Sequence, residues 1–423
     1  MMQISPETQL FIREHSSDDV RVLALQAKKY PDIDMPTAIT QIAGRKVAAE
    51  KIPSWWEIEK IWYPKHLSLE QCSSEITARY KARLLQGDSL TDLTGGFGID
   101  CSFLATGFKS ATYVERQEEL CEIAAHNFPV LNLNHINIKN EDGVTYLQAM
   151  SPVDCLFLDP ARRNEHGGKT VAISDCEPNV AELEELLLQK ANRVMIKLSP
   201  MLDLSLALKE LKQTQEVHIL SVNNECKELL ILLGQTSPAE ISIHCVNLFT
   251  KGTQKEQHFV FTREQEQCSE CTYTDSLETY LYEPNASLLK AGAFRSIAAA
   301  YPVRKLHPNS HLYTSDTFIE NFPGRIFRIV NQCSFNKKEV KENLADLKKA
   351  NVTVRNFPAT VAELRKRIHL AAKSEPDRMR SVPRSVSTSS RRRRISSPDR
   401  TPVSSESSIM SRSSVANALC CPS

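Results

Sequence analysis

The clearest signal in the chain is Asp92-Leu93-Thr94-Gly95-Gly96-Phe97-Gly98, a glycine-rich loop that follows the short apolar strand Ser89–Leu93. Side chains at the three glycine positions would collide with a ligand that lies across the strand end, so glycine lets the backbone approach closely. A tight turn needed only for packing is the alternative. Three glycines in four residues favour a ligand site, and we assign to it Asp92, Thr94, Gly95, Gly96 and Gly98.

From Ser89 onward, short apolar runs alternate with amphipathic stretches. The predicted strands are Ser89–Leu93, Ala111–Glu115, Ile136–Ile138, Asp154–Asp159, Arg193–Leu198, Val217–Val222 and Leu229–Leu233. The helices predicted between them include Gln117–Asn127, Val180–Lys190 and Leu204–Leu211. This alternation predicts an α/β fold with a Rossmann-like parallel sheet that is covered on both faces. Only Asn223–Glu228 joins the last two strands, which is too short for a parallel crossover, so the terminal strand should be antiparallel.

The remaining parts of the chain differ in pattern from this sheet. Apolar residues recur at helical spacing before it, and a second set of strands and helices follows it. Beyond Lys373 the chain is rich in serine and arginine and cannot bury enough apolar surface to fold. We therefore expect four parts: a helical N-terminal domain (1–88), a ligand-binding α/β domain (89–250), a small α+β region (251–372) and a disordered tail (373–423).

Composition limits the classes of function. The net charge is +1, but the tail carries Lys373 and nine arginines against four acids, so residues 1–372 carry −5. Nucleic-acid binding by the folded part would need a local basic patch. The twelve cysteines are scattered, mostly in apolar segments, which is typical of a reducing cytoplasm. Cys268-Ser269-Glu270-Cys271 has no second pair at zinc-site spacing, and no membrane span is expected.

Two further acidic positions fit a ligand that contains adenosine. Glu115 ends the second strand about twenty residues after the loop, where a carboxylate can accept both ribose hydroxyls. Asp142 and Gly143 follow the third strand, where an acid can accept the adenine amino group, although Asp-Gly turns are common. The alternative ligand is a dinucleotide. However, Gly96–Cys101 lacks the last glycine of GxGxxG, and Asp92 and Asp100 are unfavourable beside a pyrophosphate.

One segment distinguishes a dinucleotide from another ligand that contains adenosine. It is Leu156-Phe157-Leu158-Asp159-Pro160-Ala161-Arg162-Arg163. An apolar strand delivers Asp159 to the ligand-binding edge of the sheet, and Pro160 fixes the chain direction there. Arg162 and Arg163 can hold a substrate phosphate, or they are simply solvated. The loop 164–178 that follows is long, polar and suited to close over a substrate.

In their order, these motifs resemble the class I S-adenosylmethionine-dependent methyltransferases over roughly residues 89–235. More narrowly, the chain is similar over about residues 1–370 to bacterial methyltransferases with a C-terminal THUMP-like domain. The quoted segments are Leu69–Glu75, the Asp92 loop, Asp159–Arg162, Asn224–Glu228 and Tyr282–Ala286. This resemblance implies S-adenosyl-L-methionine as the methyl donor and RNA (tRNA or rRNA) as substrate. It also implies that Asp159 and Pro160 orient a nucleobase nitrogen for direct methylation.

Three questions stay open at the level of sequence. Asp-Pro-Ala-Arg also resembles RNA uracil-C5 methyltransferases, but Met195–Pro200 lacks the cysteine nucleophile that these enzymes need. A non-catalytic RNA-binding protein with the same fold and a nicotinamide-dependent dehydrogenase remain alternative functions. The Ser/Arg tail is either a basic arm or the product of an altered reading frame. No metal is required by the expected chemistry, and the sequence does not indicate the oligomeric state.

Overall fold

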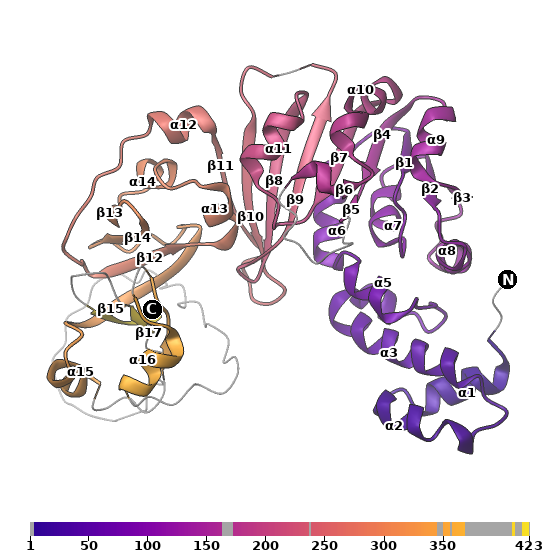
Figure 1. The fold of residues 1–423 in the computed structure, drawn as a ribbon, viewed down its shortest axis with the longest axis horizontal. Coiled ribbons are helices and arrows are strands. Elements are labelled where there is room, and N and C mark those ends of the chain that lie inside the picture. Colours follow the sequence, from indigo (N-terminus) through magenta and orange to yellow (C-terminus); the bar gives the residue numbers. More distant parts are fainter. Residues whose placement is uncertain are drawn as a thin grey trace, which may run out of the picture. The chain divides into compact units, whose positions relative to one another are not determined.

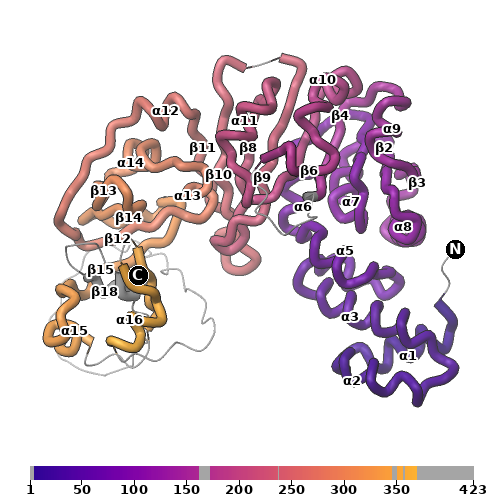
Figure 2. The backbone as a smooth tube through the Cα atoms, viewed as in Figure 1, coloured from indigo at the N-terminus to yellow at the C-terminus, as the bar shows by residue number. Residues whose placement is uncertain are grey.

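The chain folds into two compact units, Met1–Arg263 and Glu264–Ser423, which are described separately. The computed structural model describes residues 4–162, 172–236, 238–344, 350–355, 358–368, 408–410 and 417–422. Figure 2 follows the path of the backbone through both units. Among the helices described, none is long and apolar enough to cross a membrane.

The first unit begins with helices, as predicted for residues 1–88. These are α1 (Pro6–Glu14), α2 (Val20–Leu25), α3 (Met35–Lys51), α4 (Pro53–Trp56), α5 (His66–Gln71) and α6 (Glu75–Ala82). Ser5, Asp19 and Asp34 cap α1, α2 and α3 by accepting backbone N–H groups with their side chains. Trp55 and Tyr63 pack against Phe97 and Ile99, so this helical segment holds the glycine-rich loop from one side.

A nine-stranded sheet forms the centre of the first unit, in the order β11-β10-β8-β9-β7-β4-β1-β2-β3 (Figure 1). Its strands are β1 (Ser89–Asp92), β2 (Ser110–Glu115), β3 (Ile136–Asn140), β4 (Val153–Leu158), β7 (Ala191–Leu198), β8 (Thr214–Val222), β9 (Glu225–Gly234), β10 (Ser242–Leu248) and β11 (Glu256–Thr262). Strands β1, β2, β3, β4 and β7 are mutually parallel, which confirms the predicted Rossmann-like sheet.

Helices connect the parallel strands on both faces of the sheet. They are α7 (Ile99–Ala105), α8 (Glu118–Val130), α9 (Gly143–Ala149), α10 (Val180–Lys190) and α11 (Leu204–Glu210). The chain moves outward from β1 to β3 through α7 and α8, then reverses direction through α9, α10 and α11. Because such crossovers are right-handed, the two groups of helices cover opposite faces. The reversal places a crevice at the carboxyl ends of β1 and β4.

The last strand of the predicted pattern is reversed, as expected. Strand β9 lies between β7 and β8 and is antiparallel to both. Asn223 and Asn224 turn the chain between β8 and β9 with positive φ angles of 50° and 68°. Two such residues in succession are typical of a type I′ hairpin turn, which asparagine tolerates better than most residues.

The sheet continues beyond the segment assigned to it from sequence. Strand β10 pairs in parallel with β8, and β11 pairs antiparallel with β10 at the edge. The expected domain boundary at residue 250 therefore falls inside the sheet, and the compact unit extends to Arg263. The polar residues 251–255 belong to the short connection between β10 and β11. A hairpin turn and a linker between domains have similar composition, so the sequence alone did not distinguish them.

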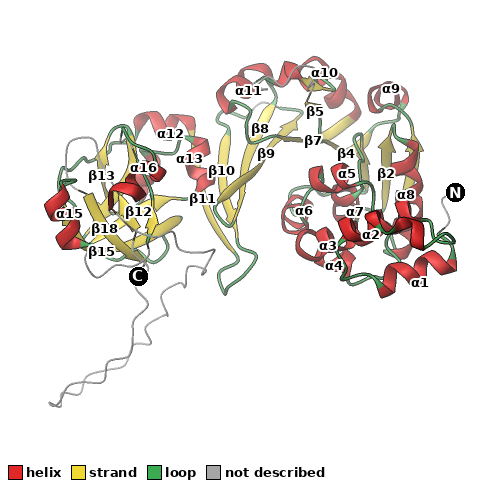
Figure 3. Ribbon diagram, turned by 60° about the horizontal axis from the view of Figure 1, so that its bottom comes forward, coloured by secondary structure: helices red, strands yellow, loops and turns green. Residues whose placement is uncertain are grey.

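The second unit contains a mainly antiparallel sheet with short helices (Figure 3, strands in yellow and helices in red). Its strands, in chain order, are β12 (Tyr280–Pro284), β13 (Arg304–His307), β14 (Ser310–Ser315), β15 (Gly324–Cys333), β16 (Asn351–Val352), β17 (Ser408–Met410) and β18 (Asn417–Pro422). The helices are α12 (Arg263–Cys268), α13 (Ala286–Ala291), α14 (Ser296–Ala300), α15 (Lys337–Asn343) and α16 (Val361–Ile368). The predicted α+β pattern is thus confirmed for the described residues.

Side chains make hydrogen bonds at the start of both α15 and α16. The Asn336 side chain accepts the Glu339 N–H at 2.9 Å, and the Glu363 carboxylate accepts the Thr360 N–H at 2.7 Å. The predicted disorder of residues 373–423 concerns a segment that lies mostly outside the described residues, and it stays a prediction. Within that segment the structure describes the backbone of β17 and β18, where β18 pairs with β15.

Candidate functional site

The glycine-rich loop lies between β1 and α7, as the sequence indicates. Gly96 and Gly98 have positive φ angles of 55° and 85°. A Cβ atom on Gly95 would lie 2.2 Å from the Tyr113 ring. These are further reasons for glycine, and the expectation that glycine clears a bound ligand here stays a prediction. Packing against Tyr113 requires glycine at position 95, whereas backbone conformation favours it at positions 96 and 98.

Asp92 ends β1 with its carboxyl group buried beneath the loop. Oδ1 accepts the Thr94 N–H at 3.0 Å, whereas the buried Oδ2 accepts no hydrogen bond from any described residue. Burial raises the pKa of Asp92 to about 8, and the nearby Asp100 and Asp159 add to this effect. A buried carboxyl oxygen without a donor is costly, so this atom is suited to accept a hydrogen bond from a bound cation.

Glu115 ends β2 and holds the loop from the neighbouring strand. Its two carboxylate oxygens accept the Gly96 N–H at 2.8 Å and the Gln117 N–H at 2.9 Å. Each oxygen keeps a second lone pair for another donor. The structure therefore places Glu115 at the loop, in the position predicted for a residue that binds ribose hydroxyls.

Asp142 and Gly143 lie at the start of α9, and both line the same cleft as the loop. Oδ1 of Asp142 caps the helix by accepting the Val144 and Thr145 N–H groups at 3.1 and 3.0 Å. A Cβ atom on Gly143 would lie 2.2 Å from the Leu93 carbonyl oxygen. Glycine is therefore required here, because the backbone segments around Leu93 and Gly143 approach each other closely. Capping explains part of the Asp-Gly signal and leaves the other carboxyl oxygen for a ligand.

Asp159 follows β4, directly beside β1. Its backbone N–H donates to the Thr94 hydroxyl at 2.6 Å, and its Oδ2 lies 2.5 Å from Nζ of Lys197. Burial raises the pKa of Asp159, although Lys197 opposes the effect. The side chain is 36% exposed and lines the cleft together with Pro160. The backbone of Arg162 forms β5 (Ala161–Arg162), while its side chain, Arg163 and most of the loop 164–178 lie outside the described residues.

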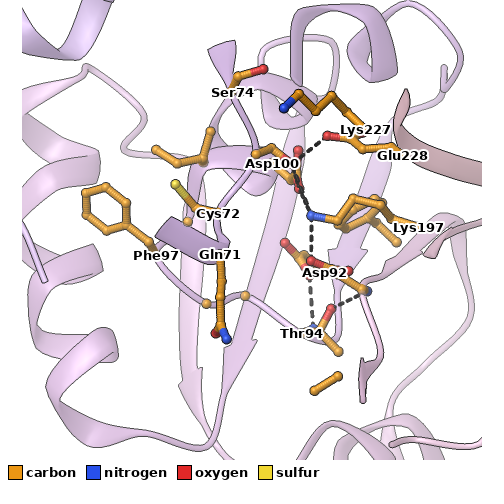
Figure 4. A pocket seen from close by; sticks show the side chains of 18 of the residues that line it. Gln71, Cys72, Ser74, Asp92, Thr94, Phe97, Asp100, Lys197, Lys227 and Glu228 are labelled. Carbon is orange, nitrogen blue, oxygen red and sulfur yellow. Dashed lines mark hydrogen bonds and ion pairs between the residues drawn. The ribbon is translucent and has the colours of Figure 1, made fainter. Parts of the chain in front are cut away.

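Asp159 is joined through Lys197 to a buried network of charges, in which Figure 4 labels Asp100, Lys197 and Glu228. Lys197 Nζ lies 3.2 Å from Asp100 Oδ2, and Lys81 Nζ lies 2.9 Å from Asp100 Oδ1 and 2.6 Å from Glu228 Oε2. The Ser73 hydroxyl accepts from both ammonium groups, at 2.8 Å from Lys81 and 3.0 Å from Lys197. Burial disfavours the Lys197 ammonium, but Asp100, Asp159 and Glu228 outweigh that effect and raise its pKa.

Most of this network was not predicted from the sequence. Asp100 was expected only as an acid beside the loop, and no role was predicted for Ser73, Lys81 or Lys197. One signal was available, because Lys197 interrupts the apolar run Val194–Leu198 of a central strand. A charged residue in such a run is almost never buried unless it is paired.

The loop, the acids and the network all border one cleft of about 2050 Å³. Residues from α5, α6 and the turn between them, including Gln71 and Ser74, line it opposite the carboxyl ends of the strands. Sites for small ligands usually have volumes of about 300–1,000 Å³. The cleft therefore has room for a cofactor and for part of a second, larger molecule.

The comparisons with known proteins agree with this architecture. The chain is similar to a provisionally assigned methyltransferase from Porphyromonas gingivalis W83, whose crystal structure is known. The match covers 99% of this chain and 98% of that protein, with 30% identity and a TM-score of 0.79. The chain belongs to the family of class I methyltransferases with a C-terminal THUMP-like domain. Family models for a ferredoxin-like domain and a THUMP-like domain match residues 280–323 and 324–382 of this methyltransferase.

More distant structures match only part of the methyltransferase. An rRNA methylase from Streptococcus thermophilus shares 14% identity, covering 38% of this chain and 93% of its own, with a TM-score of 0.28. A second match is a provisionally assigned methyltransferase from Streptococcus mutans, crystallised with S-adenosylhomocysteine. The match covers 38% of this chain and 96% of that protein, with 14% identity and a TM-score of 0.28. No curated protein sequence matches the chain.

Proposed function

We propose that this methyltransferase transfers the methyl group of S-adenosyl-L-methionine directly to a nitrogen of an RNA base. The observation that carries the proposal is the position of Asp159. Its backbone is hydrogen-bonded to Thr94 of the glycine-rich loop, and its carboxylate lies at the cleft. A group that orients the acceptor is thereby held at a set distance from the residues that would bind the donor, as catalysis by positioning requires.

The residues around the loop fit this cofactor. The unpartnered Oδ2 of Asp92 is suited to a cationic N–H donor, Glu115 to the ribose hydroxyls, and the second oxygen of Asp142 to the adenine amino group. When bound, S-adenosylmethionine supplies an electrophilic methyl group on a positively charged sulfur. The carboxyl groups near β1 stabilise positive charge at this place.

The charge of the site favours this cofactor over a dinucleotide. The ammonium groups of Lys81 and Lys197 face the carboxylates of Asp100, Asp159 and Glu228, so this buried network carries one negative charge, and Asp92 adds a second when its Oδ2 gives up a proton to accept from a bound cation. S-adenosylmethionine carries a sulfonium, an ammonium and a carboxylate, a net charge of +1. The pyrophosphate of a dinucleotide is anionic and would be repelled by this excess of negative charge.

Asp159 and Pro160 would act on the acceptor. Oδ2 of Asp159 is paired with Lys197, whereas Oδ1 has no partner among the described residues and can accept a hydrogen from an exocyclic amine. In the reaction the nitrogen lone pair forms the new N–C bond, the S–C bond breaks, and the surplus proton leaves the nitrogen through Asp159 Oδ1 to water. Because burial raises the pKa of Asp159, the carboxylate is a better proton acceptor than an exposed one.

The THUMP-like match and the size of the cleft support RNA as the substrate. The direct test is incubation with labelled S-adenosylmethionine and total RNA from a strain that lacks the gene, followed by nucleoside analysis. A single labelled nucleoside methylated on nitrogen is expected. Absence of label from RNA, with label in protein or small molecules instead, would contradict the RNA assignment.

A variant of Asp159 separates an enzyme from a non-catalytic RNA-binding protein. Asp159→Ala should abolish methyl transfer while S-adenosylhomocysteine still binds in calorimetric titration. The matched control is Asp88→Asn, because Asp88 is exposed, lies at the amino end of β1, away from the cleft, and pairs only with Lys109 among the described side chains. Equal turnover of both variants would overturn the catalytic role of Asp159, and tight binding of NAD would overturn the cofactor assignment.

A further inference from the structure

Histidine and glutamate side chains gather on one face of the sheet, near the edge opposite β3. Glu216 and His218 are two residues apart on β8, so they point to the same face. His244 on β10 lies directly opposite His218 in the parallel register. One potential ligand atom from each of Glu216, His218 and His244 lies within 4.8 Å of the other two. None of these residues belongs to the cleft described above.

Hydrogen bonds already orient all three groups, and for His244 the partners are the Ser242 hydroxyl at 3.2 Å and His258. Nε2 of His218 lies 3.2 Å from Oε2 of Glu216, and Nδ1 of His218 lies 2.8 Å from the Tyr80 hydroxyl. Arg193 donates to the other oxygen of Glu216 at 2.9 Å. Metal-binding histidines usually bond through their second nitrogen to a neighbouring group, which holds the ring and selects the tautomer. Tyr80 and Arg193 stand in these supporting positions.

A row of imidazole rings extends this cluster toward solvent. The rings of His218 and His244 stack with centroids 4.3 Å apart, and His258 of the edge strand β11 follows with its Nε2 3.1 Å from Nδ1 of His244. His258 is exposed, so an ion can reach the cluster.

We propose that Glu216, His218 and His244 bind a divalent transition-metal ion, with Zn²⁺ as the preferred occupant. Two imidazole nitrogens and a carboxylate oxygen are a common zinc ligand set, and they suit Zn²⁺ better than Mg²⁺ or Ca²⁺. Ligand atoms around a tetrahedral zinc ion are roughly 3.4 Å apart, given bonds of about 2.1 Å. The 3.2 Å separation of the Glu216 and His218 atoms matches this spacing.

The role that follows for the ion is structural. It would join β8 to β10, which are neighbours in the part of the sheet that continues past β9 to the edge strand β11. Without metal, the hydrogen-bonded chain Tyr80–His218–Glu216 satisfies the same polar groups, so the protein can fold in either state. The ion is therefore expected to stabilise the first unit without taking part in methyl transfer.

The test uses the full, untagged chain, freed of metal with a chelator and titrated with Zn²⁺ by calorimetry. One ion per chain is expected, and Co²⁺ in its place should give the visible absorption of tetrahedral coordination. His244→Asn and Glu216→Gln should each abolish uptake of the ion. Tyr80→Phe should weaken binding by roughly 10- to 100-fold, because it removes only a supporting contact.

The control replaces the other pair of potential ligands, with Cys268→Ser and Cys271→Ser in one chain. This variant should bind Zn²⁺ as the natural sequence does. The proposal is overturned if no ion binds at up to about 100 μM Zn²⁺, which is weaker than structural sites in proteins. It is also overturned if binding survives in both His244→Asn and Glu216→Gln, or if only the cysteine variant loses it. Circular dichroism of each variant verifies that it is folded.

Discussion

The backbone N–H of Asp159 donates a hydrogen bond to the side-chain hydroxyl of Thr94 at 2.6 Å. This contact joins the ends of two adjacent parallel strands, β1 and β4, whose residues are 65 positions apart in the chain. One residue belongs to the loop proposed to bind the methyl donor, and the other is proposed to orient the acceptor. The pairing of β1 with β4 and this hydroxyl group together fix the distance between the two halves of the site.

Replacing this hydroxyl tests how closely the two halves are coupled. Thr94→Val keeps the shape of the side chain but leaves the Asp159 N–H without an acceptor, at a cost of about 1–3 kcal/mol. We expect turnover with RNA to fall at least tenfold, while Thr94→Ser retains most of it because serine keeps the hydroxyl. Steady-state kinetics on both variants provide the measurement. Similar turnover of the valine and serine variants would show that the contact is not needed.

Lys197 should be essential for the stability of the fold. Lys197→Met leaves Asp159 without a cationic partner and the buried Asp100 with Lys81 alone, and removal of one partner from a buried ion pair typically costs about 3–5 kcal/mol. The midpoint of urea unfolding should fall accordingly. Lys109→Met is the matched control, because Lys109 forms an exposed ion pair with Asp88 and should leave the midpoint almost unchanged. Equal midpoints for the two variants would contradict the structural importance of the buried network.

The raised pKa of Asp92 predicts a specific dependence of stability on pH. The folded protein holds this proton up to about pH 8, whereas the unfolded chain releases it near its ordinary value of 3.8. The contribution of Asp92 to stability is therefore full below pH 3.8 and is lost as the pH rises through 8. In Asp92→Asn this loss should be absent. Urea unfolding at pH 6 and pH 9, without ligand, should show the natural sequence losing stability relative to the variant.

The loop should not tolerate a methyl group at position 95. In Gly95→Ala the new Cβ atom would lie 2.2 Å from the buried Tyr113 ring, so the loop or the ring must move. Overpacking of this kind typically costs about 1–3 kcal/mol. We also expect S-adenosylhomocysteine binding to be lost, as calorimetry can show. Gly107→Ala is the control, since its Cβ atom would approach the Leu104 carbonyl oxygen no closer than 3.8 Å. A stable Gly95→Ala variant that binds normally would refute the packing argument.

The central strands and the hairpin between β8 and β9 could be predicted from sequence because their signals are local. Apolar runs separated by helix-length segments identified the parallel strands, and the short connection Asn223–Glu228 required the reversal of β9. The same local reasoning placed Asp92, Glu115 and Asp159 at the ends of β1, β2 and β4. It failed for β10 and β11, because a strand that extends an existing sheet edge has no distinct pattern of its own.

The glycine-rich loop and Asp159-Pro160 were thus recognisable from the order of residues alone, since turn chemistry and strand ends are written in short segments. Only the tertiary structure revealed the pairing of Lys81 with Glu228 and the stacking of His218 on His244. Lys81 and Glu228 are 147 positions apart, and the two histidines meet through the register of β8 and β10. The ion pair and the stacked rings depend on burial and on partner residues that are distant in the sequence. A local stretch of chain determines neither the burial nor the partners.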